Sequence, residues 1–129
     1  MRTVRLFLLG ETAGFACAAL THLGILADGY RHRQAATAES LIGGVLLLGW
    51  LITFGGPSWG PRVATAVQAF ALFGTLVGIF TMVIGVGPRT VPDVAFHIFI
   101  VATLVSGLTL LKQLRTADET SQVSGRPRF

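Results

Sequence analysis

Four long runs of apolar residues, separated by short polar segments, dominate the amino-acid sequence. They extend over about residues 4–27, 35–54, 63–86 and 93–114. A helix of about 20 residues crosses a hydrocarbon core of about 30 Å. Backbone groups in lipid must be hydrogen-bonded within their own segment, which favours helices. The pattern therefore predicts four transmembrane helices.

Glycine and proline mark the boundaries between these runs. Asp28-Gly29 ends the first run, Gly55-Gly56-Pro57 separates the second from the third, and Gly87-Pro88 separates the third from the fourth. Connections this short join helices that run in opposite directions. We therefore expect an all-α fold, a transmembrane four-helix antiparallel bundle over residues 1–115. The polar residues 116–129 are expected to form a mobile cytoplasmic tail.

The composition agrees with a membrane protein. Charged residues make up only 12% of the chain and hydrophobic residues 52%, whereas soluble domains carry about 25% charged residues. The net charge of +4 comes from basic residues beside the apolar runs, so it indicates membrane topology and not nucleic-acid binding. The single cysteine, Cys17, excludes an intrachain disulfide and a multi-cysteine metal cluster.

Lysine and arginine are distributed unequally between the two sides of the predicted bundle. Three of them lie in the first and third connections, Arg31, Arg33 and Arg89. The other seven lie at the termini and in the second connection: Arg2, Arg5, Arg62, Lys112, Arg115, Arg126 and Arg128. The positive-inside rule then places both termini in the cytoplasm. We expect a multi-pass protein of the bacterial inner membrane, with the lipid bilayer as its main partner.

Ionisable side chains occur inside three of the four predicted spans at similar depths. With a rise of about 1.5 Å per residue, His22, Glu39 and His97 each lie about 6–7 Å inside the outer end of their helices. An ionisable group inside a membrane is costly and is usually paired or functional. We therefore predict one site formed by His22, Glu39 and His97 near the outer leaflet.

Further polar and apolar residues are expected around this site. Glu11 shares a helix face with His22, and Gln68 lies at about the depth of Glu11, so the two predict a second, inner polar layer. Other candidates for substrate contacts are two apolar wall residues and two outer polar residues: Trp50, Met82, Arg89 and Asp93. Asp93 is also expected to begin the fourth helix or to pair with Arg89.

Two segments and one histidine in the second half of the chain form a recognisable pattern. They are Ala69-Phe70-Ala71-Leu72-Phe73-Gly74-Thr75-Leu76-Val77-Gly78, then Gly85-Val86-Gly87-Pro88-Arg89-Thr90-Val91-Pro92-Asp93, and then His97. Together they resemble a group of small bacterial four-span integral membrane proteins with no assigned activity. The resemblance covers the chain from about Glu11 to Leu111. It implies four spans and carries no activity or site residue to this chain.

The predicted site is compatible with several functions. Two imidazoles and a carboxylate are ligands for a transition metal, with His22, Glu39 and His97 as the metal ligands. Two histidines on facing helices can instead hold haem iron. Alternatively, Glu39, His22 and His97 are the catalytic groups of an acid–base enzyme that acts on a lipophilic small molecule. An isomerase, cyclase or hydrolase would fit this second interpretation.

Two further interpretations, transport and a structural role, require neither a bound metal nor catalysis by the polar residues. Stacked polar layers can move protons or small solutes, although four helices enclose little space unless the chain forms a homodimer or larger membrane complex. Polar side chains also hold transmembrane helices together. The chain would then be a structural or accessory subunit of a membrane complex.

Overall fold

The computed structural model describes residues 1–56 and 59–124, without the side chains of residues 118, 119 and 121–124. Within these residues the fold is all-helical, with no β-strand beyond one isolated bridge between Leu23 and Arg31. The helices are α1 (Arg2–His22), α2 (Arg33–Ile52), α3 (Gly60–Val83) and α4 (Val91–Ser124). Each is long and apolar enough to cross a membrane, α4 over Val91–Ala117.

The ends of two helices differ from the boundaries predicted from hydrophobicity. The first helix ends at His22 and not near residue 27, because Gly24 adopts a left-handed φ of 74°, the conformation that commonly terminates helices. The fourth helix continues through the predicted tail as far as Ser124. The sequence has no glycine or proline between Gly107 and Gly125, so nothing local interrupts this helix. Residues 125–129 of the predicted tail lie outside the described residues.

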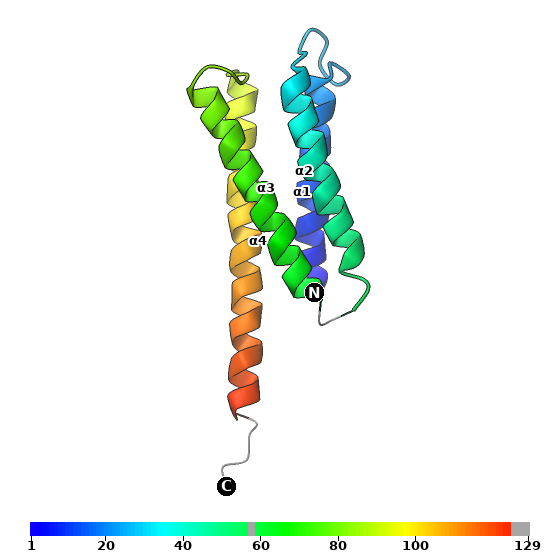
Figure 1. The fold of residues 1–129 in the computed structure, drawn as a ribbon, viewed down its shortest axis with the longest axis vertical. Helices are drawn as coiled ribbons and strands as arrows, with labels where there is room; N and C mark the ends of the chain where they lie inside the picture. The colour runs from blue at the N-terminus through cyan, green and yellow to red at the C-terminus, as the bar shows by residue number, and fades with distance from the viewer. Residues whose placement is uncertain (57–58, 125–129) are drawn as a thin grey trace.

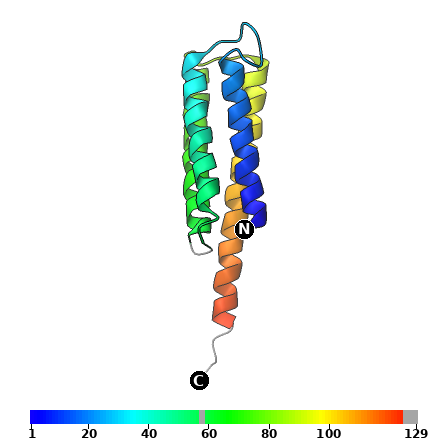
Figure 2. The same ribbon diagram turned by 90° about the vertical axis from the view of Figure 1, so that its right-hand side faces the viewer.

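The helices lie lengthwise beside one another (Figures 1 and 2). α1 packs against α2 and α4, and α3 also packs against α2 and α4. The connections 23–32 and 84–90 lie at the same end of the molecule, and α4 extends beyond the opposite end of the other three helices (Figures 1 and 2). Side chains close to both connections therefore come together at one end of the fold.

The interior contains an apolar core together with several buried polar side chains, and many large hydrophobic side chains are exposed on the outside of the helices. Two glycines permit the close approach of α2 and α3: a Cβ at Gly49 would lie 2.6 Å from Val67, and one at Gly74 would lie 2.8 Å from Ile42. Such small residues are common where membrane helices meet. The buried hydrophobic core consists of Val4, Leu8, Phe15, Ile42, Leu46, Ala64, Ala71, Ile100, Leu104 and Leu111.

Arg5 joins the start of α1 to the end of α2. Its guanidinium donates to the Thr53 hydroxyl at 3.1 Å and to the Thr53 carbonyl at 2.7 Å. It also lies 4.0 Å from the ring centroid of Phe54, at a distance typical of a cation–π contact. These contacts link the two helix ends on the side opposite to His22.

Replacing Arg5 by alanine is expected to lower the free energy of unfolding by about 1–2 kcal/mol, because two charge-assisted hydrogen bonds are lost at a half-buried position. The measurement is a titration of the protein in mixed micelles with sodium dodecyl sulfate, followed by circular dichroism. Arg2→Ala removes the same charge from an exposed position. An equal loss in both variants would assign the effect to net charge and not to the Thr53 contacts.

Candidate functional site

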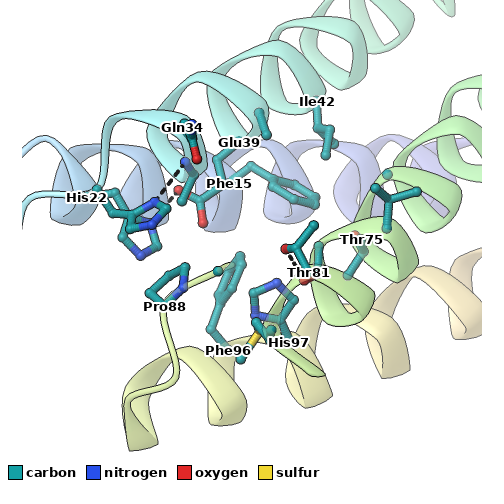
Figure 3. Close-up of a pocket in the computed structure, with 18 of the residues that line it drawn as sticks. Phe15, His22, Gln34, Glu39, Ile42, Thr75, Thr81, Pro88, Phe96 and His97 are labelled. Carbon is teal, nitrogen blue, oxygen red and sulfur yellow. Dashed lines mark hydrogen bonds and ion pairs between the residues drawn. The ribbon is translucent and has the colours of Figure 1, made fainter. Parts of the chain in front are cut away.

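His22 is buried at the end of α1 and contacts two carboxylates from other parts of the chain. Its Nδ1 lies 2.7 Å from Oε2 of Glu39, and its Nε2 lies 3.1 Å from Oδ1 of Asp93. All three side chains are at least 90% buried, with exposed fractions of 4%, 8% and 4%. Figure 3 shows His22 beside Glu39. One imidazole thus connects α1, α2 and α4.

Local structure explains why these three side chains meet. His22 is the last residue of α1, and its carbonyl accepts a hydrogen bond from the backbone N–H of His32 at 2.9 Å. This bond holds the start of α2 beside the end of α1. Glu39 lies in the second turn of α2, on the same buried face as Gly43 and Leu46. Asp93 lies in the first turn of α4.

Asp93 accepts several hydrogen bonds in addition to the contact with His22. Its Oδ2 accepts from the Thr90 backbone N–H at 2.9 Å and from the Thr90 hydroxyl at 2.7 Å. The Tyr30 hydroxyl donates to the same oxygen. An ionised carboxylate is the form that only accepts hydrogen bonds. These partners therefore fit Asp93 as a fixed anion that orients His22.

Tyr30 covers the site from the connection between α1 and α2. Its ring stacks on the imidazole of His22, with centroids 5.4 Å apart and an interplanar angle of 27°. Burial and the hydrogen bond to Asp93 raise the pKa of Tyr30 above its ordinary value. The phenol therefore stays protonated at neutral pH and can donate to Asp93.

The two contacts of His22 restrict where its protons lie. With Asp93 ionised, Nε2 must carry the proton that joins the two groups, because a carboxylate has no proton to donate. One further proton is then shared between Nδ1 of His22 and Oε2 of Glu39. Its position determines whether the pair is imidazolium–carboxylate or imidazole–carboxylic acid. Such a pair can donate or accept a proton.

Glu39 and His22 lie at the edge of a cavity of about 190 Å³. Figure 3 shows side chains from all four helices around it, with Glu39 and Ile42 on α2 facing Phe96 and His97 on α4. Its walls are mostly apolar, and no lysine or arginine is among its described lining residues. The lining residues are Phe15, His22, His32, Gln34, Ala35, Ala38, Glu39, Ile42, Gly74, Thr75, Val77, Gly78, Thr81, Met82, Val86, Gly87, Pro88, Phe96 and His97.

His97 lines the cavity, and its hydrogen bond is to the backbone of its own helix. Its Nδ1 lies 2.7 Å from the backbone carbonyl oxygen of Asp93. Because a carbonyl only accepts, Nδ1 carries a proton, and Nε2 of the neutral ring keeps a lone pair. That Nε2 lies close to Gly78, 3.1 Å from the position a Cβ would take there. Gly78 thus provides room for the imidazole in the cavity wall.

The geometry does not favour the predicted metal or haem site. In the described part of the chain, no group of three or more His, Cys, Asp and Glu side chains could hold a metal ion. Both ring nitrogens of His22 are engaged by carboxylates, so no lone pair is free for a metal. The third member of the cluster with His22 and Glu39 is Asp93 and not the predicted His97.

The predicted inner layer of Glu11 and Gln68 is present as a direct contact. The Gln68 amide nitrogen lies 2.9 Å and 3.0 Å from the two oxygens of Glu11, and both side chains are fully buried. Gly107 on α4 makes room for the amide, since a Cβ there would lie 2.3 Å from its nitrogen. This pair does not line the 190 Å³ cavity.

The remaining predicted contact residues lie in different places. Met82 lines the cavity, whereas Trp50 and Arg89 are not among its described lining residues. Trp50 packs edge-on against Phe54, and Arg89 donates to the carbonyl oxygens of Met82 and Val83 at the end of α3. Tyr30 was not among the predicted residues, because no helical spacing relates a residue in a connection to one in a helix.

The chemistry of the site must therefore be inferred from its own geometry. An apolar cavity at one end of the four apolar helices is lined by three imidazoles and one carboxylate, those of His22, His32, His97 and Glu39. Asp93 contacts His22 without lining this cavity. Comparison with protein-family models, curated proteins and solved structures finds no significant match.

Proposed function

We propose that the chain is a multi-pass protein of the bacterial inner membrane, an antiparallel bundle with both termini in the cytoplasm. The four apolar helices and the outward-facing large hydrophobic side chains support insertion into a bilayer. The excess of lysine and arginine at the termini and in the second connection supports the orientation. In this orientation, the His22 site lies near the outer leaflet.

We further propose that the cavity binds an uncharged lipophilic small molecule and that Glu39 exchanges a proton with it. The observation that carries this proposal is the buried contact of His22 with both Glu39 and Asp93 at the edge of an apolar cavity. Asp93 orients the imidazole, while the proton between Nδ1 and Glu39 remains transferable. The absence of lysine and arginine among the described lining residues disfavours an anionic ligand.

Glu39 and His97 approach the cavity from different helices, which suits an isomerisation. His97 Nε2 would take a proton from one carbon of the substrate, and Glu39 would deliver its proton to another carbon as the double bond moves between them. One proton leaves the substrate and one enters it, so the composition of the substrate is unchanged. Exchange with water then returns the proton from His97 to Glu39. Acid–base catalysis of this kind typically contributes about 10²–10⁴-fold to a rate.

A structural subunit is the competing function, since the same contacts of His22 connect three helices. Polar networks in membranes can serve that purpose alone. The two proposals differ in one expectation. A network that only joins helices has no lipid-soluble product that depends on the Glu39 carboxyl group.

The test is untargeted mass spectrometry of lipid-soluble metabolites in membranes isolated from cells that express the wild type or Glu39→Gln, with the isolated membranes incubated in water or in D₂O. The variant keeps the size of the side chain but cannot act as an acid, so product formation should fall by at least about 100-fold. The product formed in D₂O should carry deuterium at one carbon. Size-exclusion chromatography should show both proteins as folded and monodisperse.

Asp28→Asn is the matched control, because it removes an exposed carboxylate from the connection beside the site. Product formation should remain at the wild-type level in this variant. A product profile that is identical in cells expressing the wild type, Glu39→Gln and no protein would refute the catalytic proposal and favour a structural role.

A further inference from the structure

A second cavity, of about 330 Å³, lies between α1 and α4 on the other side of His22. Most of its lining is apolar, and its polar members gather near the Asp93 carboxylate. The lining residues are Gly14, Cys17, Ala18, Thr21, His22, Ala27, Tyr30, Pro92, Asp93, Phe96 and Phe99. This cavity is distinct from the one bordered by Glu39.

His22 and Phe96 line both cavities and form the wall between them. The two nitrogens of His22 are divided between the two sides, because Glu39 lines only the first cavity and Asp93 only the second. The imidazole is held by hydrogen bonds on each side. Phe96 is therefore the movable part of the wall.

Phe96 is half-buried and is held by apolar contacts, against the hydrophobic core and against two neighbouring rings. Its ring packs edge-on against Phe15 at 5.9 Å and against His97 at 5.6 Å between centroids. Figure 3 shows it beside His97 on α4. Edge-to-face contacts contribute only about 0.5–1.5 kcal/mol each beyond the area they bury. Rotation of Phe96 would therefore give up apolar contacts but no hydrogen bond with the described residues, and it would open the wall that the two cavities share.

The second cavity is open on the outer surface of the helices, which would face the hydrocarbon of the bilayer in the proposed orientation. Cys17, Pro92 and Phe99 in its lining are exposed on the outside of the helices. Gly14 and Ala18, one turn apart on α1, have side chains too small to fill the space between α1 and α4. No lysine or arginine is among its described lining residues. Its chemistry matches the uncharged ligand proposed for the first cavity.

We infer that the second cavity is the lateral entrance through which an uncharged lipophile passes from the outer leaflet to Glu39, with Phe96 as the gate. This inference rests on the proposed function, since it supplies the route for the same ligand. The shared wall of His22 and Phe96 provides the continuity between entrance and site. The route needs no passage through water, which an apolar ligand would avoid.

Cys17 allows the route to be blocked in the native chain, because it is the single cysteine and is exposed at the entrance. The probe is an uncharged adamantane diazirine, added to the protein in lipid nanodiscs and cross-linked by light. Peptide mass spectrometry measures the adducts at Ile42 and Met82 in the first cavity. Phe73, which is exposed on α3, reports labelling from the surrounding lipid.

Modification of Cys17 with benzyl methanethiosulfonate should abolish the adducts at Ile42 and Met82 and leave those at Phe73 unchanged. The Cys17→Ala variant should keep all adducts in the presence of the reagent. Phe96→Trp, which enlarges the gate, should reduce labelling of the first cavity without any thiol reagent. Chromatographic monodispersity confirms that the variants are folded.

Unchanged labelling of Ile42 and Met82 after modification of Cys17 would overturn the inferred route. The same conclusion follows if the reagent abolishes first-cavity labelling in Cys17→Ala as well. These outcomes do not depend on turnover, so they leave the Glu39 proposal standing. Conversely, loss of the Glu39-dependent product after modification of Cys17, with unchanged labelling at Phe73, supports both.

Discussion

Replacing His22 by alanine is expected to lower the free energy of unfolding by about 3–5 kcal/mol, the usual cost of removing one partner from a buried ionic contact. The substitution leaves the carboxyl groups of Glu39 and Asp93 buried without the imidazole between them. The measurement is reversible unfolding in mixed micelles by titration with sodium dodecyl sulfate, followed by circular dichroism.

His97→Ala is the matched control, because it removes the same side chain from a half-buried position that does not link two carboxylates. Its loss of stability should be smaller, about 1 kcal/mol, the value of a single hydrogen bond. Adding Glu39→Gln and Asp93→Asn to His22→Ala should restore part of the loss, since neutral amides are less costly to bury than carboxylates. Equal losses for His22→Ala and His97→Ala would contradict the assigned role of His22.

Hydrophobic runs were sufficient to predict the number of helices and their approximate positions. Helix ends were harder to predict, since they depend on local backbone geometry. Gly24 ends α1 before the apolar run is complete, whereas α4 continues through polar residues because they include no helix breaker. Hydrophobicity measures how a residue partitions into lipid, and it does not measure whether the backbone can remain helical.

Depth along the helices predicted part of the site. It placed His22 and Glu39 at one level, and the structure brings them into contact. It could not distinguish Asp93 from His97, because the two residues are one turn apart on the same face of α4. The choice depends on the packing of α4 against α1. That packing brings the Asp93 carboxylate to His22 and directs His97 into the cavity wall.

The inner pair of Glu11 and Gln68 is where a single and a double substitution should differ most in stability. Gln68→Leu removes the only described hydrogen-bond donor to the carboxyl group of Glu11, which is fully buried. A buried acceptor without a partner costs about 1–3 kcal/mol, and more if it is charged. The single variant should therefore unfold at a markedly lower detergent fraction than the wild type.

Combining Glu11→Leu with Gln68→Leu should recover most of that loss, because replacing both partners by apolar side chains of similar size is often nearly neutral. The Gln68 carbonyl oxygen supports this expectation, since it is buried without a hydrogen-bond partner among the described residues and its removal relieves a cost. A double variant less stable than Gln68→Leu alone would show that Glu11 contributes through contacts other than Gln68. Recovery would instead identify the inner pair as a specific link between α1 and α3 that an apolar contact can replace, in contrast to the His22 site, where the proposed function requires the Glu39 carboxyl group.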